Sequence, residues 1–309
     1  MPVSIVILTF NRSELLDSLL TSLQEISYRE LEVIVVDNHS EDDTEKIVTD
    51  KHPGYVFIKT DQNIGVGARN VGLQRARGDI VICLDDDVFG IDDRAIAILV
   101  EKFNHDPQIG AINFKVLDFS TGEICNWIHH CKKEEYSDRF FKTYEITEGA
   151  VAFQKKALVA AGFYPEYFFI SHEGPDLAFR LMDKGFDVVY MGDVAVRHRH
   201  SNLGRKSWFS YYYNTRNQFW LAARNFPLLY ALKYLFRGQL STLIYSIRDG
   251  FFTYWLKAVK DGILGLPRAL ADRKVVSECT KNVIREIDDM KPSLCYMLKE
   301  RMFRKGMRL

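Results

Sequence analysis

The sequence has few cysteines and prolines and contains no long hydrophobic run. Its five cysteines are odd in number and form no Cys-x-x-Cys pair, so they do not indicate a disulfide framework. Without a recognisable secretory signal at the N-terminus, they predict reduced thiols and a cytoplasmic protein. No segment reaches the roughly 18–20 uninterrupted apolar residues of a membrane-spanning helix. The nearest approach, residues 219–236, is interrupted by Arg224, Asn225, Pro227 and Lys233.

A zinc site is not indicated either. The segment CNWIHHC at 125–131 has adjacent histidines and a six-residue cysteine spacing, which match no common zinc pattern. We interpret it as part of an irregular insert over residues 118–143.

The formal net charge of the chain is zero, but its two parts carry net charges of opposite sign. Residues 1–196 hold 19 Lys and Arg against 33 Asp and Glu, whereas residues 197–309 hold 22 against 8. A basic C-terminal part of this kind predicts contact with something anionic, such as membrane lipid, nucleic acid or a phosphorylated acceptor. The composition, with 47% hydrophobic and 27% charged residues over 309 positions, is typical of a globular protein.

Short apolar runs alternate with helical segments in the first part of the chain. Strands are predicted at 3–10, 31–37, 55–60 and 79–85, and each is apolar almost throughout. This pattern indicates a doubly wound α/β domain whose mostly parallel sheet is covered on both faces. In such sheets ligands bind outside the carboxyl ends of the strands.

The second part of the chain is predicted to be helical. One helix is expected over 175–185. Further helices, rich in aromatic and basic residues, are expected from 205 to 264 and from about 277 to 305, with a break at 265–267. We therefore divide the chain into a catalytic domain, 1–204, and a C-terminal basic aromatic helical region, 205–309.

Polar side chains follow three of the predicted strands, at Thr9–Arg12, Asp37–Asn38 and Asp85–Asp87. These clusters would gather at one edge of the sheet, and their convergence predicts a binding site there. Asp85 and Asp87, two residues apart, could share a Mg²⁺ or Mn²⁺ ion. The alternative is an acidic loop capping the next helix, but Asp92 and Asp93 already serve as cap candidates.

Five segments taken together resemble the inverting glycosyltransferase family 2, whose nucleotide-sugar-binding fold is called GT-A. They are VILTFNR (6–12), VIVVDNHSEDDT (33–44), NIGVGARNVGLQRARGDIVICLDDDV (63–88), GPDLAFRLMDKGFDVVY (174–190) and RNQFW (216–220). They occur in the family's order and cover most of residues 1–225. Several stretches resemble the branch that contains bacterial rhamnosyl- and galactofuranosyltransferases.

The resemblance implies a set of nucleotide-sugar contacts. It assigns them to Thr9, Asn11, Arg12, Asp37, Asn38, Gly65, Arg69, Asp85, Asp86 and Glu148. Asp37 would accept the imide N–H of uracil or thymine, and Arg69 would lie near the nucleotide beside a turn made tight by Gly65. Asp85 would reach the ribose or the metal, and Glu148 would hold sugar hydroxyls, or form only a strand-entry turn with Gly149. Arg69 could instead be a surface helix residue, and Asp86 receives no specific contact.

The same resemblance implies a Mn²⁺ or Mg²⁺ site formed by Asp85, Asp87 and His198, where His198 fits the family position better than His200. The cation would neutralise charge on the departing nucleoside diphosphate. Family members carry an aspartate as catalytic base where Gly174 stands here. We therefore expect Glu173 to be the base, with Asp176 as the fallback. Asp176 could also be no more than a first-turn acid of its helix.

We expect a metal-dependent inverting glycosyltransferase that moves a sugar, a hexose or deoxyhexose, from a UDP- or dTDP-sugar to a hydroxyl of a glycan or lipid-linked glycan in cell-surface polysaccharide synthesis. The alternatives are a non-catalytic sugar-nucleotide-binding protein and a sugar nucleotidyltransferase. The latter would need a glycine-rich phosphate loop that LTFNRSELL (8–16) lacks. The C-terminal helices predict peripheral contact with the anionic inner face of the plasma membrane, or packing in the molecule or a homo-oligomer; nucleic acid binding is not indicated.

Overall fold

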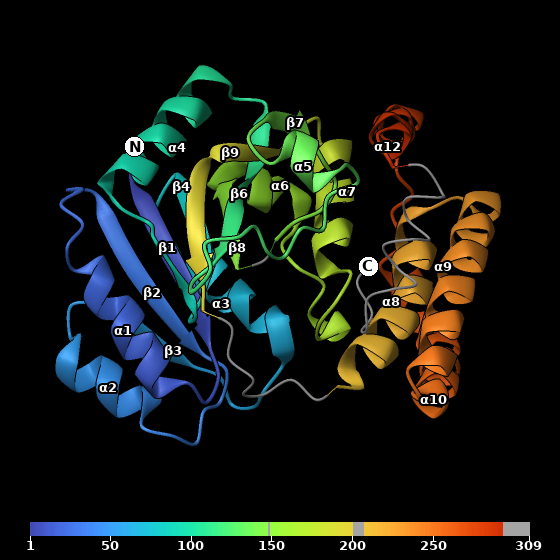
Figure 1. Cartoon of the computed structure of the whole chain (residues 1–309), viewed down its shortest axis with the longest axis horizontal. Coiled ribbons are helices and arrows are strands. Elements are labelled where there is room, and N and C mark those ends of the chain that lie inside the picture. The colour runs from blue at the N-terminus through green and yellow to red at the C-terminus, as the bar shows by residue number, and fades with distance from the viewer. Residues whose placement is uncertain (148, 200–206, 293–309) are drawn as a thin grey trace.

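The computed structural model describes residues 1–147, 149–199 and 207–292 (Figure 1). Its centre is one twisted sheet with the strand order β3-β2-β1-β4-β8-β6-β9-β5, and β7 pairs with β9 outside this path. The strands are β1 (Val3–Thr9), β2 (Leu31–Asp37), β3 (Val56–Lys59), β4 (Ile80–Asp85), β5 (Val88–Phe89), β6 (Ile109–Asp118), β7 (Phe140–Lys142), β8 (Ala150–Gln154) and β9 (Asp187–His198).

The predicted α/β class is confirmed, and the parallel arrangement holds for β1 to β4. The other half of the sheet is mixed. Strand β8 runs antiparallel between β4 and β6, and β5 and β7 run antiparallel to β9, while β6 and β9 are parallel. Parallel neighbours need a crossover, usually a helix. The chain instead reaches β8 through the insert at 118–143, whose regular elements are only α5 (Lys133–Tyr136) and β7.

Both faces of the sheet are covered, because successive side chains along a strand point to opposite sides. On β1, Ile5 and Ile7 belong to the core cluster formed with α1 (Ser13–Leu23), α2 (Thr44–Lys51) and α4 (Asp93–His105). Val6 belongs to the cluster on the other face, with α3 (Arg69–Arg75), α6 (Lys155–Ala161) and α7 (Glu173–Asp183). The two layers of helices flank the sheet in Figure 1.

The C-terminal helices pack beside this domain. They are α8 (Phe209–Asn225), α9 (Leu228–Arg248), α10 (Phe252–Leu264), α11 (Leu266–Ala271) and α12 (Glu278–Asp289). Helix α8 lies nearest the sheet, and α9 and α10 lie outside it (Figure 1). The predicted break at 265–267 is confirmed, because α10 ends at Leu264 and α11 begins at Leu266. The predicted boundary at 204 lies outside the described residues.

Helix α8 shares its core with the α/β domain. Leu221 of α8 and Phe226, which follows that helix, belong to the same buried cluster as Leu177 and Ala178 of α7. In the described part of the chain, no helix combines the length and the apolar character needed to cross a bilayer.

Candidate active site

The carboxyl ends of three parallel strands meet at one edge of the sheet. The strand register pairs Thr9 with Asp37 and Leu8 with Asp85. The polar clusters predicted at these strand ends are therefore adjacent, as the doubly wound topology requires.

Within the acidic triplet, Asp86 and Asp87 are buried and Asp85 is only partly so. The Arg12 Nη1 atom lies 2.9 Å from Asp86 Oδ1 and 2.7 Å from Asp87 Oδ2. Thr9 Oγ1 donates a hydrogen bond of 2.8 Å to Asp86 Oδ2. Because a buried like-charged pair needs a counter-ion, Arg12 explains how the two adjacent carboxylates are tolerated.

These contacts give Asp86 and Arg12 a different place from the one expected. Both were expected to contact the nucleotide, but Arg12 is turned towards Asp86 and Asp87, and Asp86 braces the end of β1 against that of β4. Burial raises the pKa of Asp86 to about 7, a shift that the charge of Arg12 opposes and the charge of Asp87 increases. Asp86 is therefore an internal support of the triplet.

His198, at the end of β9, lies beside Asp87. Its Nε2 atom is 3.2 Å from Asp87 Oδ1, and its Nδ1 atom is 2.8 Å from Asn126 Nδ2. Burial lowers the pKa of His198, but hydrogen bonds with Asp87 and Cys125 outweigh it and raise the pKa to about 9. Asn126 comes from the insert, so the insert fixes the imidazole on the side away from Asp87.

The Asp87–His198 pair suits a divalent cation as a partial set of ligands. A carboxylate oxygen and an imidazole nitrogen are both ligands of Mn²⁺, and Mg²⁺ and Mn²⁺ sites commonly take their remaining ligands from water and substrate phosphates. No cluster of three or more His, Cys, Asp or Glu side chains placed to hold a metal is found among residues 1–147, 149–199 and 207–292. A complete cage made by these residues alone is therefore not present.

An ion pair with Arg69 holds Asp85 in place. The Arg69 guanidinium forms an ion pair with the Asp85 carboxylate and donates a hydrogen bond of 3.1 Å to the Leu84 carbonyl. Its side chain is 1% exposed, so Arg69 is not a surface helix residue. Gly149 lies against the same carboxylate, because a Cβ atom there would overlap the Asp85 side chain. Glu148 lies outside the described residues.

Asp37 is fully buried at the end of β2. Its Oδ1 atom accepts a 2.9 Å hydrogen bond from the Ser40 N–H. Its Oδ2 atom has no hydrogen-bond partner in the described structure, and the Lys59 Nζ atom is 3.9 Å away. Because a buried carboxylate oxygen that accepts no hydrogen bond is costly, this atom is suited to accept one from a ligand.

The other residues of this edge support its loops. The Asn38 side chain accepts from the Ile64 N–H at 3.0 Å and donates to Asn63 and to the Gly65 carbonyl. Asn11 accepts from the Glu41 N–H at 2.8 Å. Both were expected to contact the nucleotide, and here they join the loops that follow β1, β2 and β3.

Gly65 joins the strand edge to the segment that contains Glu173. Its φ is +68°, and a Cβ atom there would overlap the Phe169 carbonyl oxygen. The next residue, Val66, donates a 2.7 Å hydrogen bond to that same oxygen. The predicted tight turn is thus present, and it allows the close approach of the segment before α7. Glu173 is the first residue of α7 and is buried.

The segment before Glu173 has an unusual backbone. Phe169, Ser171 and His172 have φ values of 68°, 75° and 66°, a region that non-glycine residues seldom adopt. Asn217 of α8 holds this segment, because its Nδ2 atom donates to the carbonyls of Phe168, Ile170 and Ser171 at 3.0, 2.8 and 2.7 Å. Strain of this kind persists where surrounding contacts over-determine it.

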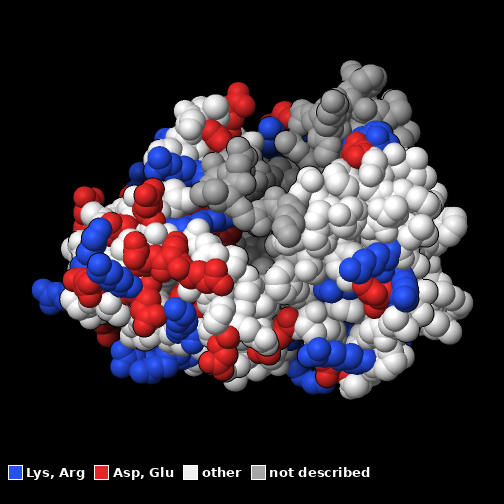
Figure 2. All heavy atoms as spheres, turned by 90° about the horizontal axis from the view of Figure 1, so that it is seen from below, with Lys and Arg blue, Asp and Glu red and all other residues white. Residues whose placement is uncertain are grey.

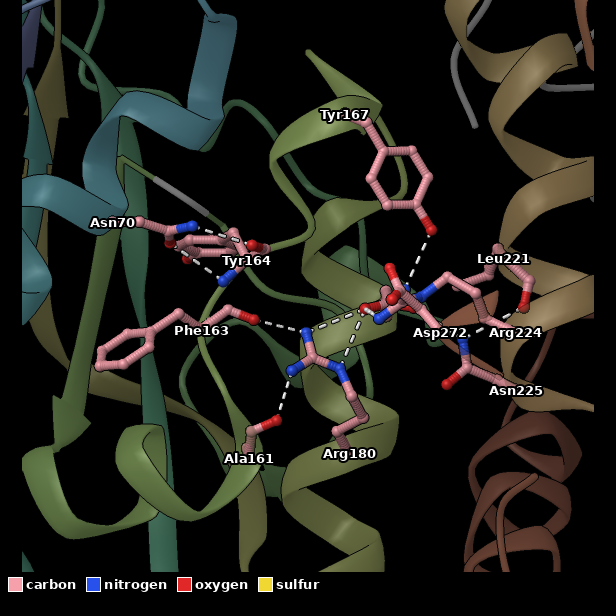
Figure 3. A network of polar contacts seen from close by, with 11 residues as sticks. Asn70, Ala161, Phe163, Tyr164, Tyr167, Arg180, Leu221, Arg224, Asn225 and Asp272 are labelled. Atoms are coloured by element: carbon pink, nitrogen blue, oxygen red, sulfur yellow. Dashed lines mark hydrogen bonds and ion pairs between the residues drawn. The ribbon is translucent and has the colours of Figure 1, made fainter. Parts of the chain in front are cut away.

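Asp176 lies one helical turn beyond Glu173 and is fully buried. Its Oδ2 atom pairs with Arg180, and its Oδ1 atom accepts from Arg224 at 2.8 Å and from Asn225 at 2.7 Å. Figure 3 shows Arg180 and Arg224 converging from α7 and α8, with Tyr167 and Asp272 also in contact with Arg224. With both oxygens in ion pairs, Asp176 joins α7 to α8, which favours its structural role over that of a base.

Two supporting residues were not found by sequence reasoning. Asn126 lies in the insert, where the sequence carries no recognisable signal for a contact with His198. Asn217 belongs to RNQFW, which resembled the family without being given a role. The sequence of α8 carries several amides and no signal that singles out Asn217.

The model of glycosyl transferase family 2 matches residues 4–159, just over half of the chain. Poly-beta-1,6-N-acetyl-D-glucosamine synthase of Staphylococcus aureus (strain COL) is 30% identical over 106 residues, 33% of this chain and 26% of the synthase. The synthase of Staphylococcus epidermidis is 33% identical over 113 residues, 36% of this chain and 27% of the synthase. The chain thus spans about a quarter of the length of these curated relatives.

Solved structures are similar in fold. S. aureus TarS 1-349 superposes with a TM-score of 0.60 at 18% identity, covering 88% of this chain and 83% of that one. The mannosyltransferase PcManGT from Pyrobaculum calidifontis, in complex with GDP-Man and Mn²⁺, superposes with a TM-score of 0.57 at 18% identity, covering 97% and 83%. The fold is thus the predicted GT-A type with C-terminal helices.

Proposed function

The chain belongs to glycosyl transferase family 2, and on that premise we propose that it is an inverting glycosyltransferase that uses a nucleoside-diphosphate sugar. The donor would be a UDP- or dTDP-sugar. The acceptor would be a hydroxyl of a glycan or lipid-linked glycan, in cell-surface polysaccharide synthesis at the inner face of the plasma membrane. The related synthases, whose names describe a polysaccharide product, and TarS in complex with UDP-GlcNAc support this class of donor and product.

One observation carries the proposal: Asp37, Asp85, Asp87 and His198 meet at the carboxyl edge of the sheet. An Asp37 carboxylate oxygen that accepts no hydrogen bond in the described structure suits the imide N–H of a pyrimidine base. The partly exposed Asp85 suits a ribose hydroxyl, and its ion pair with Arg69 positions its carboxylate. Asp87 and His198, 3.2 Å apart, suit a cation that would neutralise charge on a diphosphate.

Asp87 and His198 would hold Mn²⁺ or Mg²⁺. Asp85, which is paired with Arg69 and forms no cluster of three with them in the described structure, would have to reorient to join them. When bound, the cation supplies Lewis-acid stabilisation of the charge that develops on the departing nucleoside diphosphate. PcManGT, whose structure contains Mn²⁺, supports a cation of this kind. For the pair to bind it, His198 Nε2 must be free of its proton. The remaining ring proton is then on Nδ1, and Asn126 would have to turn its amide so that Oδ1, in place of Nδ2, accepts from that nitrogen.

Glu173 would act as the base. Its carboxylate would take the proton of the acceptor hydroxyl as that oxygen attacks the anomeric carbon and the bond to the diphosphate oxygen breaks. The configuration at carbon is thereby inverted. Glu173 stands at the N-terminus of α7, on a segment held by Asn217 and by the turn at Gly65. Asp176 would be a positioning residue, since its ion pairs fix the same helix.

The test is product formation with Mn²⁺ across a panel of UDP-, dTDP- and GDP-sugars, followed by the Glu173→Gln variant. General bases contribute about 10²- to 10⁴-fold to rate, so we expect a loss of kcat in that range with donor affinity nearly unchanged. Glu101→Gln on the exposed surface of α4 is the matched control and should leave kcat unaltered.

Near-normal turnover by Glu173→Gln would remove Glu173 from the role of base. Donor binding without transfer to any acceptor in the wild-type protein would favour the non-catalytic alternative. Chelation of the cation should abolish transfer reversibly, and transfer that persists in excess chelator would contradict the proposed cation site.

A further inference from the structure

Helix α9 has an exposed stripe of large apolar side chains. We call it the α9 stripe; its residues are Leu229, Leu232, Phe236, Leu240, Ile244 and Ile247. Leu229 is 83% exposed and Phe236 is 72% exposed. The residues are three or four positions apart, so they lie along one side of the helix. Soluble proteins seldom expose a contiguous apolar surface of this length unless something covers it.

The neighbouring helix α10 extends this surface. Its residues Leu256 and Leu264 are exposed as well. In Figure 1, α9 and α10 form the part of the molecule farthest from the sheet, with α8 on their inner side. The described residues of the α/β domain therefore leave the outer side of these helices uncovered.

The charge around the α9 stripe is basic. Residues 228–271 contain six Lys and Arg and two acids, Asp249 and Asp261. Tyr211 donates to Asp249 at 2.7 Å and Tyr212 donates to Asp261 at 2.6 Å, so both acids are engaged by α8. Lys233 and Arg237 are exposed on α9 next to the stripe. Figure 2 shows a broad uncharged surface over the C-terminal helices with small groups of basic side chains on it, accompanied by a few acidic ones.

A bilayer suits this combination better than a second copy of the chain. In a twofold dimer the same surface would face itself, which would bring the basic flank against its own copy. An anionic bilayer instead offers acyl chains to the apolar side chains and phosphate groups to the lysines and arginines.

We propose that the outer side of α9 and α10 docks on a bilayer with anionic head groups, with the α9 stripe inserted at the level of the acyl chains and Lys233 and Arg237 among the phosphates. The choice of a lipid-linked acceptor rests on the proposed function, but the docking itself does not. A membrane-bound enzyme would meet such an acceptor in the plane of the bilayer.

The test is co-sedimentation of the full chain with vesicles of phosphatidylglycerol and phosphatidylcholine, and with phosphatidylcholine vesicles alone. The wild-type protein should bind the anionic vesicles more tightly, and less so as salt rises. The double variant Leu229→Gln/Phe236→Gln should weaken binding at least tenfold. Arg237→Gln should weaken binding to anionic vesicles by about fivefold, since each such residue contributes about 1 kcal/mol near the surface.

Val159→Gln is the matched control, because Val159 is an exposed apolar residue of α6, 60% exposed, on the α/β domain. It should bind vesicles as the wild type does. Failure of the wild type to bind anionic vesicles, or equal binding by the double variant, would overturn the proposal. So would a concentration-dependent dimer that the double variant disrupts in the absence of vesicle binding. Transfer to a water-soluble acceptor is measured in parallel, so that loss of docking and failure of the proposed activity are told apart.

Discussion

At the scale of single residues, this site is organised by arginines that neutralise buried carboxylates. Arg12 neutralises Asp86 and Asp87, Arg69 neutralises Asp85, and Asp176 lies between Arg180 and Arg224. Removing one partner of such a pair leaves an uncompensated buried charge. The acids that follow the strands can therefore remain charged at the site, because arginines distant in the sequence form ion pairs with them.

Asp176 allows this to be tested by its pH dependence. Burial raises its pKa, but the charges of Arg180 and Arg224 outweigh burial and leave the pKa below the ordinary value. Asp176→Asn should therefore lower the free energy of unfolding by about 3–5 kcal/mol near neutral pH. A carboxylate whose pKa is lower in the folded state than in the unfolded state stabilises the folded protein fully at pH values above its unfolded pKa of about 3.9. This stabilisation is lost as the pH falls through its folded pKa.

The difference between wild type and Asp176→Asn should accordingly be full at neutral pH and shrink below about pH 4. Thermal unfolding followed by circular dichroism over this range measures it. Asp50→Asn, an exposed residue of α2, changes the net charge equally and should have little effect. A constant difference at every pH would show that Asp176 does not act through its charge.

At the scale of elements, the segment before α7 is the part that depends most on its neighbours. Its residues with positive φ need contacts from outside the segment to keep this backbone conformation. Asn217 of α8 supplies three hydrogen bonds to it. Arg216 adds a 2.7 Å hydrogen bond from its Nη2 atom to the Phe168 carbonyl. Helix α8 therefore controls the position of Glu173 although it contributes no reacting group.

Asn217→Ala should lower kcat at least tenfold while the Kd for the donor changes little, because the segment that carries Glu173 loses its support. Leaving buried carbonyls without donors should also cost about 1–3 kcal/mol of stability. Gln239→Ala is the matched control, since this α9 amide donates to the Thr215 carbonyl at 2.9 Å and does not touch the segment. Equal loss of kcat in both variants would mean that α8 contributes only general stability.

At the scale of the whole molecule, the expected division at residue 204 does not correspond to separate cores. Trp220 and Leu221 of α8 and Ile284 of α12 lie in the same buried cluster as Phe179 of α7. A chain ending at residue 204 would expose the apolar surface that these residues cover. The two parts would then depend on each other for folding.

We therefore expect one cooperative transition in differential scanning calorimetry of the full chain, with equal calorimetric and van't Hoff enthalpies. A chain ending at residue 204 should fail to give the dispersed amide spectrum of a folded domain. Two separate transitions, or a folded 1–204 chain, would support the two-domain division instead.

The sequence by itself determined the α/β class, the four N-terminal strands and the break at residue 265, because apolar periodicity and breaking residues are local signals. It also determined the family, through segments whose order is more specific than any one of them. Only the tertiary structure decided that β8 runs antiparallel to β4 and that Arg69 forms an ion pair with Asp85. It alone decided too that Asn126 contacts His198 and Asn217 supports the segment before Glu173. These contacts join residues distant in the chain, and hydrophobic patterning carries no information about which buried polar group meets which.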